Sequence, residues 1–496
     1  MSNTVVGAVD AAGLPEELGA FDMLLHRGEA NPRTRSGIMA LEILDTTPDW
    51  SRFVAVFEHA SRRVLRLRQK VVVPTVPTAS PRWVVDPDFN LNFHVRRVRV
   101  PDPGTMREVF DLAEVSLQSP LDISRPLWTV TLVEGLADGR AALLLHMSHA
   151  VTDGVGAVEM FAHIYDLERD PPPREPVPLP IPQDLTGNDL AREGLNRLPI
   201  ALLGGVRGAV SGAAQVVGRV LSNPVSAVEG VVEYARSGAR VMSTVAEHSP
   251  LLRRRSLSSH SEAIDIRFTD IRAAAKAAEG SINDAYLAAL CGALRRYHYK
   301  LGVPIDSLPM AVPVNLRADA DPAGGNRFAG VMISAPLGIT DPTARIHDVR
   351  TQMCKRREEP AIDLIGAVAP LIGLLPDPVV ESIASSVVSS DVQASNIAVY
   401  AGDTYIAGAK VLRQYGLGPL PGVAMMAVLI SRGGMCTVTT RYDRASFTGD
   451  QLWARCLLAG FNEVLALGGE GRAAPASFDE SADTVQPPSH NGSSPS

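Results

Sequence analysis

The chain has 496 residues, of which 46% are hydrophobic and 20% are charged, and its formal net charge at pH 7 is −7. This length is enough for two or three ordinary domains, and the composition is that of a globular protein with a core. The acidic balance, without a basic patch along the chain, excludes nucleic acid as an expected partner.

The four cysteines, Cys291, Cys354, Cys436 and Cys456, lie far apart and show no Cys-x-x-Cys spacing. This pattern argues against a zinc site and against a disulfide framework. We therefore expect no metal ion and a reducing, cytoplasmic environment.

Membrane insertion is not expected from the sequence. The N-terminus lacks the basic and then apolar layout of a signal peptide. The longest apolar stretches, residues 364–375 and 422–430, are shorter than the ~20 residues that a bilayer-spanning helix needs. These features predict a protein that is soluble or peripherally attached to a membrane.

The first part of the chain, residues 14–169, mixes strand-like and helix-like patterns of apolar residues. Strands are expected at residues 37–42, 93–98, 127–133 and 141–147, and helices at residues 49–64, 106–118 and 155–167. Such a mixture predicts a layered α/β or α+β domain.

A connector follows this first part. Residues 171–182 are rich in proline, which cannot continue a helix. Residues 198–247 are rich in Gly, Ala, Val and Ser, with apolar residues at near-helical spacing. This stretch is either an amphipathic segment that lies on a membrane surface or a helical connector between domains, and we favour the connector.

The last part of the chain, residues 264–467, is again a mixture of strand and helix patterns. Strands are expected at residues 264–268, 308–314, 331–336, 423–430 and 435–442, and helices at residues 270–278, 282–299 and 451–467. Residues 470–496 are polar and rich in Pro and Ser, which predicts a disordered tail.

The most informative motif is His149-Ala150-Val151-Thr152-Asp153-Gly154, which directly follows a strand-like apolar run. A histidine has its ordinary pKa near neutral pH, so it can take a proton from a hydroxyl group and later return it. The motif suits an enzyme in which an alcohol attacks an acyl thioester. The alternative is structural, with His149 packed in the core and Asp153 as an N-cap of the next helix.

Further segments extend this motif into a longer pattern, in a fixed order along the chain: Pro126-Leu127-Trp128, Ser148–Gly154, Asn283-Asp284, Pro313–Arg317 and Ala394–Ile397. In these segments the chain resembles the bacterial wax ester synthase/acyl-CoA:diacylglycerol acyltransferase (WS/DGAT) family. The resemblance runs from about residue 14 to about residue 467.

The chain departs from the family's pattern at two places. Ser148 stands where the family's His-His-x-x-x-Asp-Gly motif has its first histidine, whereas His149 matches the second. Residues 397–400, Ile-Ala-Val-Tyr, replace the Val-Pro-Gly-Pro turn of the family's Ser-Asn-Val-Pro-Gly-Pro segment. The second departure predicts a loop of different local shape.

The resemblance implies a fold of two lobes like those of chloramphenicol acetyltransferase, with an active-site channel between them. We assign the N-terminal lobe to residues 1–170, the Pro-rich linker and helical connector to residues 171–260, the C-terminal lobe to residues 261–469 and the tail to residues 470–496.

The resemblance also implies a reaction, in which a fatty acyl group passes from acyl-CoA to diacylglycerol or to a long-chain alcohol. His149 is the implied general base, and Asp153 and Gly154 are implied to support the site. Asn283, Ser395 and Asn396 are candidates for contact with the substrate or with the oxyanion. Asn283 and Asp284 equally fit a cap at the start of a helix. No cofactor is expected, because acyl-CoA is a substrate.

Two alternatives remain open at this point. The chain is either an acyltransferase that uses another acceptor or a carrier-protein thioester, or a non-catalytic protein that binds lipid droplets. The expected location is cytoplasmic, with peripheral contact to the inner membrane or to lipid droplets. We expect His146 and Trp128 to be packed inside the first lobe.

Overall fold

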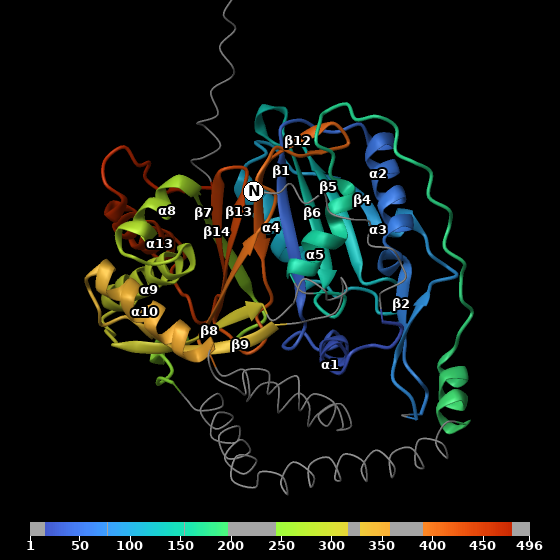
Figure 1. Ribbon diagram of the computed structural model, residues 1–496, viewed down its shortest axis with the longest axis horizontal. Helices are drawn as coiled ribbons and strands as arrows, with labels where there is room; N and C mark the ends of the chain where they lie inside the picture. The colour runs from blue at the N-terminus through green and yellow to red at the C-terminus, as the bar shows by residue number, and fades with distance from the viewer. Residues whose placement is uncertain are drawn as a thin grey trace, which may run out of the picture.

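The computed structural model describes residues 15–76, 78–152, 154–196, 245–315, 328–357 and 390–478. These residues form two mixed α/β lobes, each built on a large sheet (Figure 1). Most of the expected connector, residues 197–244, and the apolar stretch 364–375 lie outside the described residues.

The first sheet has the strand order β11-β12-β1-β6-β5-β4. Its neighbours pair antiparallel, except that β4 and β5 are parallel. The strands are β1 (Gly37–Leu44), β4 (Val95–Arg99), β5 (Trp128–Glu134), β6 (Ala141–Ser148), β11 (Tyr405–Ile406) and β12 (Ala409–Leu417).

Helices cover both faces of the first sheet, which explains why β6 is apolar at every position before His146. Leu143, Leu145 and Met147 pack in one cluster with α2 (Trp50–Arg63) and α5 (Gly154–Met160). Ala142 and Leu144 point to the other face and pack against α4 (Met106–Gln118). Successive side chains of a strand point to opposite faces, so a strand between two layers must be apolar on both.

Smaller elements surround this lobe. They are α1 (Ala20–Gly28), α3 (Leu91–His94), the hairpin of β2 (Gln69–Val72) and β3 (Arg82–Val85), and the 3₁₀ turns Leu65–Arg68, Ala137–Gly139 and Phe161–Ile164. Trp128 is fully buried among them, stacks on His94 and donates its indole N–H to the Leu67 carbonyl at 2.8 Å. The expectation that Trp128 and His146 are packed inside the lobe is confirmed.

The second sheet has the strand order β15-β7-β14-β13-β10-β8-β9. Its strands are β7 (Ser259–Arg267), β8 (Ser307–Asn315), β9 (Phe328–Pro336), β10 (Val392–Ala398), β13 (Met425–Arg432), β14 (Met435–Asp443) and β15 (Ala476–Ser477). A helical layer covers its outer face (Figure 1), formed by α8 (Phe268–Ala277), α9 (Ile282–Lys300), α10 (Pro342–Arg357) and α13 (Asp450–Leu465). The 3₁₀ turn Pro250–Leu252 precedes β7 in the chain, and the 3₁₀ turn Ala466–Gly468 follows α13.

A strand from the last part of the chain completes the sheet of the first part. β12 pairs antiparallel with β1, with Met39 opposite Leu417 and Glu42 opposite Gln414. β12 also packs against β13 of the second sheet. The two lobes are therefore joined through β12 as well as through the chain that connects them.

A buried ion pair provides a second link between the lobes. Glu114 on α4 is bonded to Arg441 on β14, whose Nε lies 3.1 Å from the carboxylate Oε2. The hydroxyl groups of Ser259 and Ser261 on β7 also donate to this carboxylate. Burial raises the pKa of Glu114, but the charge of Arg441 and the two hydroxyls outweigh burial and hold the pKa below its ordinary value.

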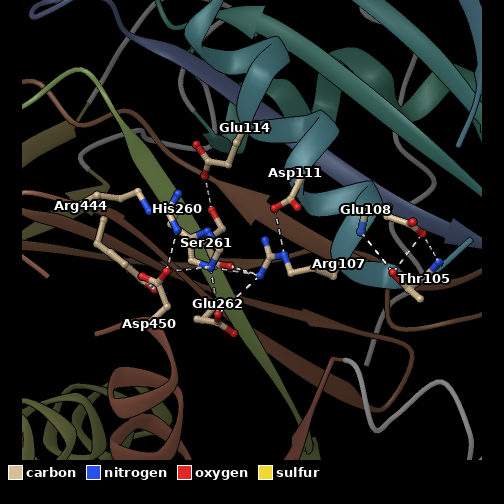
Figure 2. A network of polar contacts seen from close by, with 11 residues as sticks. Thr105, Arg107, Glu108, Asp111, Glu114, His260, Ser261, Glu262, Arg444 and Asp450 are labelled. Atoms are coloured by element: carbon tan, nitrogen blue, oxygen red, sulfur yellow. Dashed lines mark hydrogen bonds and ion pairs between the residues drawn. The ribbon is translucent and has the colours of Figure 1, made fainter. Parts of the chain in front are cut away.

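Figure 2 shows how this contact continues along α4 and β7. Arg107 on α4 bonds to Asp111 one turn away, at 3.0 Å, and donates to the backbone carbonyl of Ser261 at 2.9 Å. His260 lies 3.1 Å from the Glu262 carboxylate on the same strand. Side chains of α4 and β7 thus form one polar seam between the two sheets.

Several sequence expectations match the structure closely. The helix expected at residues 106–118 is α4 with the same bounds, and the helix expected at 282–299 is α9. Both helices begin with a capping box, Thr105 with Glu108 and Ser281 with Asp284. Such a box satisfies backbone N–H groups that have no partner inside the helix.

Three expectations were wrong. The helix expected over residues 155–167 ends at Met160 and continues only as the 3₁₀ turn Phe161–Ile164. Ile397 and Ala398, expected in a loop, are the last residues of β10, because β10 pairs with β13 along its whole length. The tail is ordered as far as Phe478, which is buried against Phe110 of α4 while β15 pairs with β7.

None of the helices in the described ranges combines the length and the apolar character that crossing a membrane requires.

We expect Glu114→Gln to lower the free energy of unfolding by about 3–5 kcal/mol, because it leaves the buried Arg441 charge without its partner. Asp111→Asn is the matched control on the same helix. It removes an exposed ion pair with Arg107 and should cost no more than about 1 kcal/mol. Urea unfolding of both variants measures the difference, and equal losses would contradict a linking role for Glu114.

Candidate active site

A cavity of about 200 Å³ lies between the two sheets. Its walls come from both sheets, with β1, β6, β12, α5 and the turn after α5 on one side and β8, β10 and β13 on the other. Most of the wall is apolar and includes Ile38, Leu145, Phe161, Met426, Val428 and Ile430. An apolar cavity with few polar groups is the usual form of a site for a small molecule.

Gly416 of β12 lets the two sheets approach closely along this cavity. A Cβ atom on Gly416 would lie 2.8 Å from Val428 Cγ1 and 2.9 Å from Ile430 Cδ1. Both distances are too short for carbon atoms in van der Waals contact. Glycine at this position therefore allows β12 to belong to the first sheet while lying against the side chains of the second.

His149 is half-buried and lines this cavity. It is the first residue after β6, and its side chain lies on the same face of the strand as Leu145 and Met147. Its backbone N–H donates to the carbonyl of Ser36 at 3.1 Å, just before β1 begins. The paired ends of β1 and β6 thus fix the backbone from which the ring reaches the cavity.

Ser148 points to the opposite side of β6 from His149 and bonds to a buried carboxyl group. Its hydroxyl donates to Glu29 Oε1 at 2.6 Å and accepts the backbone N–H of Ala150 at 3.1 Å. The hydroxyl of Ser36 donates to the same Glu29 oxygen at 3.2 Å. Glu29 therefore ties together the two backbone segments that hold His149.

The Glu29 carboxyl group titrates abnormally because it is buried. Burial raises its pKa above the ordinary value, although the hydroxyls of Ser148 and Ser36 oppose this effect. No sequence motif singles out Glu29. Only its isolated charge between α1 and β1 could have indicated it, and its contact with Ser148 spans 119 positions along the chain.

His146 illustrates the difference between the two faces of β6. It is buried on the face opposite His149, and burial lowers its pKa to about 3. A Cβ atom on Gly37 would lie 2.7 Å from His146 Nε2, so β1, which pairs with β6, needs glycine at position 37. His146 is thus held neutral inside the lobe, away from the cavity.

The other predicted site residues are partly brought together. Ser395 and Asn396, on β10, line the same cavity as His149. Asn283 lies at the start of α9 and accepts a hydrogen bond from the Asn396 amide at 3.4 Å. Of the neighbours Asn283 and Asp284, it is Asp284 that caps the helix, because it forms the capping box with Ser281.

Asp153 lies outside the described residues, so its implied role in supporting the site stays a prediction. Gly154 is the first residue of α5, whose later residues Ala157 and Val158 line the cavity. Within the described ranges, no group of three or more His, Cys, Asp or Glu side chains is arranged to hold a metal ion.

The family assignment follows from comparison with known proteins. The family model described as "Wax ester synthase/diacylglycerol acyltransferase catalytic domain" matches residues 8–286, and that described as "WS/DGAT C-terminal domain" matches residues 324–464. The chain belongs to the WS/DGAT family. Both matched regions contribute residues to the wall of the cavity.

Relatives from Mycobacterium tuberculosis support this assignment. One protein of strain H37Rv, whose name assigns it provisionally to the diacylglycerol O-acyltransferases, is 69% identical over 482 residues, covering 97% of this chain and 98% of its own. Another protein of that strain with the same type of name is 30% identical over 366 residues, covering 70% of this chain and 73% of its own.

Solved structures show the same two-lobe fold. The wax ester synthase/diacylglycerol acyltransferase from Marinobacter aquaeolei VT8 has a TM-score of 0.59 at 19% identity and covers 91% of this chain and 100% of its own. The first condensation domain of the calcium-dependent antibiotic synthetase has a TM-score of 0.58 at 15% identity, covering 94% and 99%. The expected fold of chloramphenicol acetyltransferase type, with two lobes, is confirmed.

We expect Glu29→Gln to change how stability depends on pH. A carboxyl group whose pKa is raised by folding stabilises the fold at low pH, and this contribution is lost as pH rises through and above its ordinary pKa of about 4.3. The glutamine has no charge to bury, so the variant should gain stability relative to the parent as pH rises from about 4 to about 8. Thermal unfolding at a series of pH values measures this, and a difference that stays constant with pH would contradict the assignment.

Proposed function

We propose that this protein is an acyl-CoA-dependent O-acyltransferase that esterifies diacylglycerol, a long-chain alcohol or both. The observation that carries this proposal is the position of His149 on the wall of an apolar cavity between the lobes. The family supports acyl transfer in general. The position of His149 and the apolar cavity support the more specific proposal that His149 is the base and that the cavity holds the substrate chain.

In the proposed reaction His149 acts first as a base and then as an acid. The ring accepts the proton of the acceptor hydroxyl while the oxygen attacks the thioester carbonyl carbon. When the tetrahedral intermediate collapses, the carbon–sulfur bond breaks and the ring gives the proton to the sulfur of CoA. The products are an ester and free CoA, and no covalent enzyme intermediate is needed because the acceptor oxygen is itself the nucleophile.

Negative charge that develops on the carbonyl oxygen needs a hydrogen-bond donor. Asn396 and Ser395, which carry an amide and a hydroxyl, line the same cavity as His149. The bond from Asn396 to Asn283 holds this amide against the N-terminus of α9, where the helix dipole favours negative charge. We propose Asn396 as the first candidate donor, with Asn283 positioning it.

The cavity wall suits an alkyl chain. Burial of apolar surface contributes roughly 25 cal/mol per Å², and each buried CH₂ group contributes about 0.8 kcal/mol. A long acyl or alkyl chain along Met426, Val428 and Ile430 would therefore bind tightly without specific polar contacts. Diacylglycerol is held in lipid, so we propose that the protein works in the cytoplasm at the surface of the inner membrane or of lipid droplets.

The two other interpretations make different demands on the cavity. An enzyme that uses a carrier-protein thioester or another acceptor keeps the role of His149 and differs only in its products. A non-catalytic lipid-droplet protein would have no use for a histidine on the cavity wall. The replacement at Ser148 gives that interpretation little support, because Ser148 lies on the face of β6 away from the cavity.

We expect His149→Ala to lower the rate of CoA release at least about 100-fold, since general acid–base catalysis contributes typically 10²–10⁴-fold. The assay uses purified protein, an acyl-CoA and a panel of diacylglycerols, alcohols and amines, so that the product identifies the acceptor. His59→Ala, on α2, is the control for loss of a histidine outside the cavity. A folded His149→Ala protein with full activity would refute the role of His149.

We expect Ser148→Ala to retain the proton-transfer chemistry while losing stability. The variant removes a hydroxyl that bonds buried Glu29, at a cost of about 1–3 kcal/mol. The pH profile of CoA release should keep its shape in this variant, because the proposed base, His149, is unchanged. A folded Ser148→Ala protein without turnover would instead assign Ser148 to the chemistry.

A further inference from the structure

The cavity that His149 lines contains a second polar cluster, formed by Glu42 on β1, Gln414 on β12 and Tyr165 after α5. Glu42 is the charged exception in β1, an otherwise apolar strand. Its side chain lies on the same face of the strand as Ile38 and Ala40, which also line the cavity. The mechanism proposed above does not use this cluster.

Glu42 is buried and only half satisfied by hydrogen bonds. The residue is 1% exposed, and its Oε1 accepts the phenolic hydroxyl of Tyr165. Its Oε2 has no hydrogen-bond partner among the described residues. A buried carboxyl oxygen without a partner is costly, so such an oxygen on a cavity wall indicates a group that a ligand supplies.

Arg432 holds this cluster in place without bonding the carboxyl group directly. Its guanidinium donates to Gln414 Oε1 at 2.8 Å and to the hydroxyl of Thr404. It also lies 4.9 Å from the ring centre of Tyr165. Burial raises the pKa of Glu42, and the Arg432 charge and the Tyr165 hydroxyl partly oppose this shift.

The cluster lies far from His149 along the cavity. Ser36 accepts the backbone N–H of His149, and Glu42 is six residues further along the same chain. At about 3.4 Å per residue, the two ends are about 20 Å apart along β1. The wall between them is apolar, so a chain that reaches from His149 to Glu42 is an alkyl chain with a polar group at its far end.

We propose that Glu42, with Tyr165 and Gln414, is a subsite for a hydroxyl group at the far end of an acyl or acceptor chain whose reacting end lies at His149. This inference rests on the proposed function, which places the reacting end of the chain at His149. It adds a substrate class to that function. The favoured substrates are long chains that carry a second hydroxyl group, such as ω-hydroxyacyl thioesters or α,ω-diols.

The charges around the cluster favour a neutral hydroxyl over an ion. A terminal carboxylate would be buried beside the carboxyl group of Glu42. A terminal ammonium group would lose its hydration and lie near the positive charge of Arg432, so both ions are disfavoured. A hydroxyl group donates one hydrogen bond to Oε2 and buries no charge. Ionic chain ends should therefore bind more weakly than the hydroxyl.

The test compares binding within two pairs of compounds by calorimetry with the full-length protein. In the first pair, an unreactive S-alkyl-CoA thioether is compared with its ω-hydroxy counterpart, in which CoA fixes the orientation of the chain. In the second pair, a long-chain 1-alkanol is compared with the α,ω-diol of the same length, after correction for its two equivalent hydroxyls. We expect at least about fivefold tighter binding of the hydroxyl-ended member in one pair, and that pair shows which substrate reaches the subsite.

Variants of Glu42 assign the preference to this side chain. Glu42→Leu should abolish it, and Glu42→Gln should retain it, because the amide still offers a hydrogen bond to a hydroxyl group. Met426→Leu, which changes only the apolar wall, should alter both members of a pair equally. Should Glu42→Leu fail to fold, the comparison in the unchanged protein and in Glu42→Gln still decides the matter.

Equal affinities within both pairs for the unchanged protein would overturn the inference, as would a preference that persists in Glu42→Leu. These results do not depend on turnover. Absence of CoA release with every acceptor would contradict the proposed function instead, and it would leave the calorimetric comparison standing.

Discussion

The antiparallel pairing of β1 with β12 is the constraint on which the rest of the structure depends. β1 begins next to the segment that holds His149, and β12 comes from the part of the chain that builds the second sheet. β12 pairs with β1 and also lies against β13, so this one strand links the two sheets. The cavity between them is therefore a fixed part of the fold.

Strand alternation turns this constraint into a site. On β6, His146 and Ser148 point to the packed face and His149 to the cavity, so adjacent residues have opposite environments. On β1, the same alternation places Ile38, Ala40 and Glu42 along the cavity. A shift of one residue in the pairing of these strands would bury the cavity residues and expose the packed ones, so register and function are coupled.

Local elements could be predicted from the sequence because their signals are local. The capping boxes at Thr105 and Ser281 fix where two helices begin, and the apolar run before His149 identifies β6. By contrast, β12 contains the polar residues Lys410, Arg413 and Gln414. Their bonding partners, Asp45, Asp265 and Arg432, lie outside the strand, so the local sequence does not indicate its place in the sheet. Glu29 and Glu42 each bond a partner more than 100 positions away, Ser148 and Tyr165 respectively, which no local pattern contains.

The central claim is that one alkyl chain lies between the sheets with its reacting end at His149. A crystal structure with an unreactive S-alkyl-CoA thioether bound tests this claim most directly. The account predicts that the sulfur lies within about 3–4 Å of the His149 ring, with the alkyl chain along β1 and β12. A thioether bound elsewhere, with the His149 ring out of reach of the sulfur, would contradict the account.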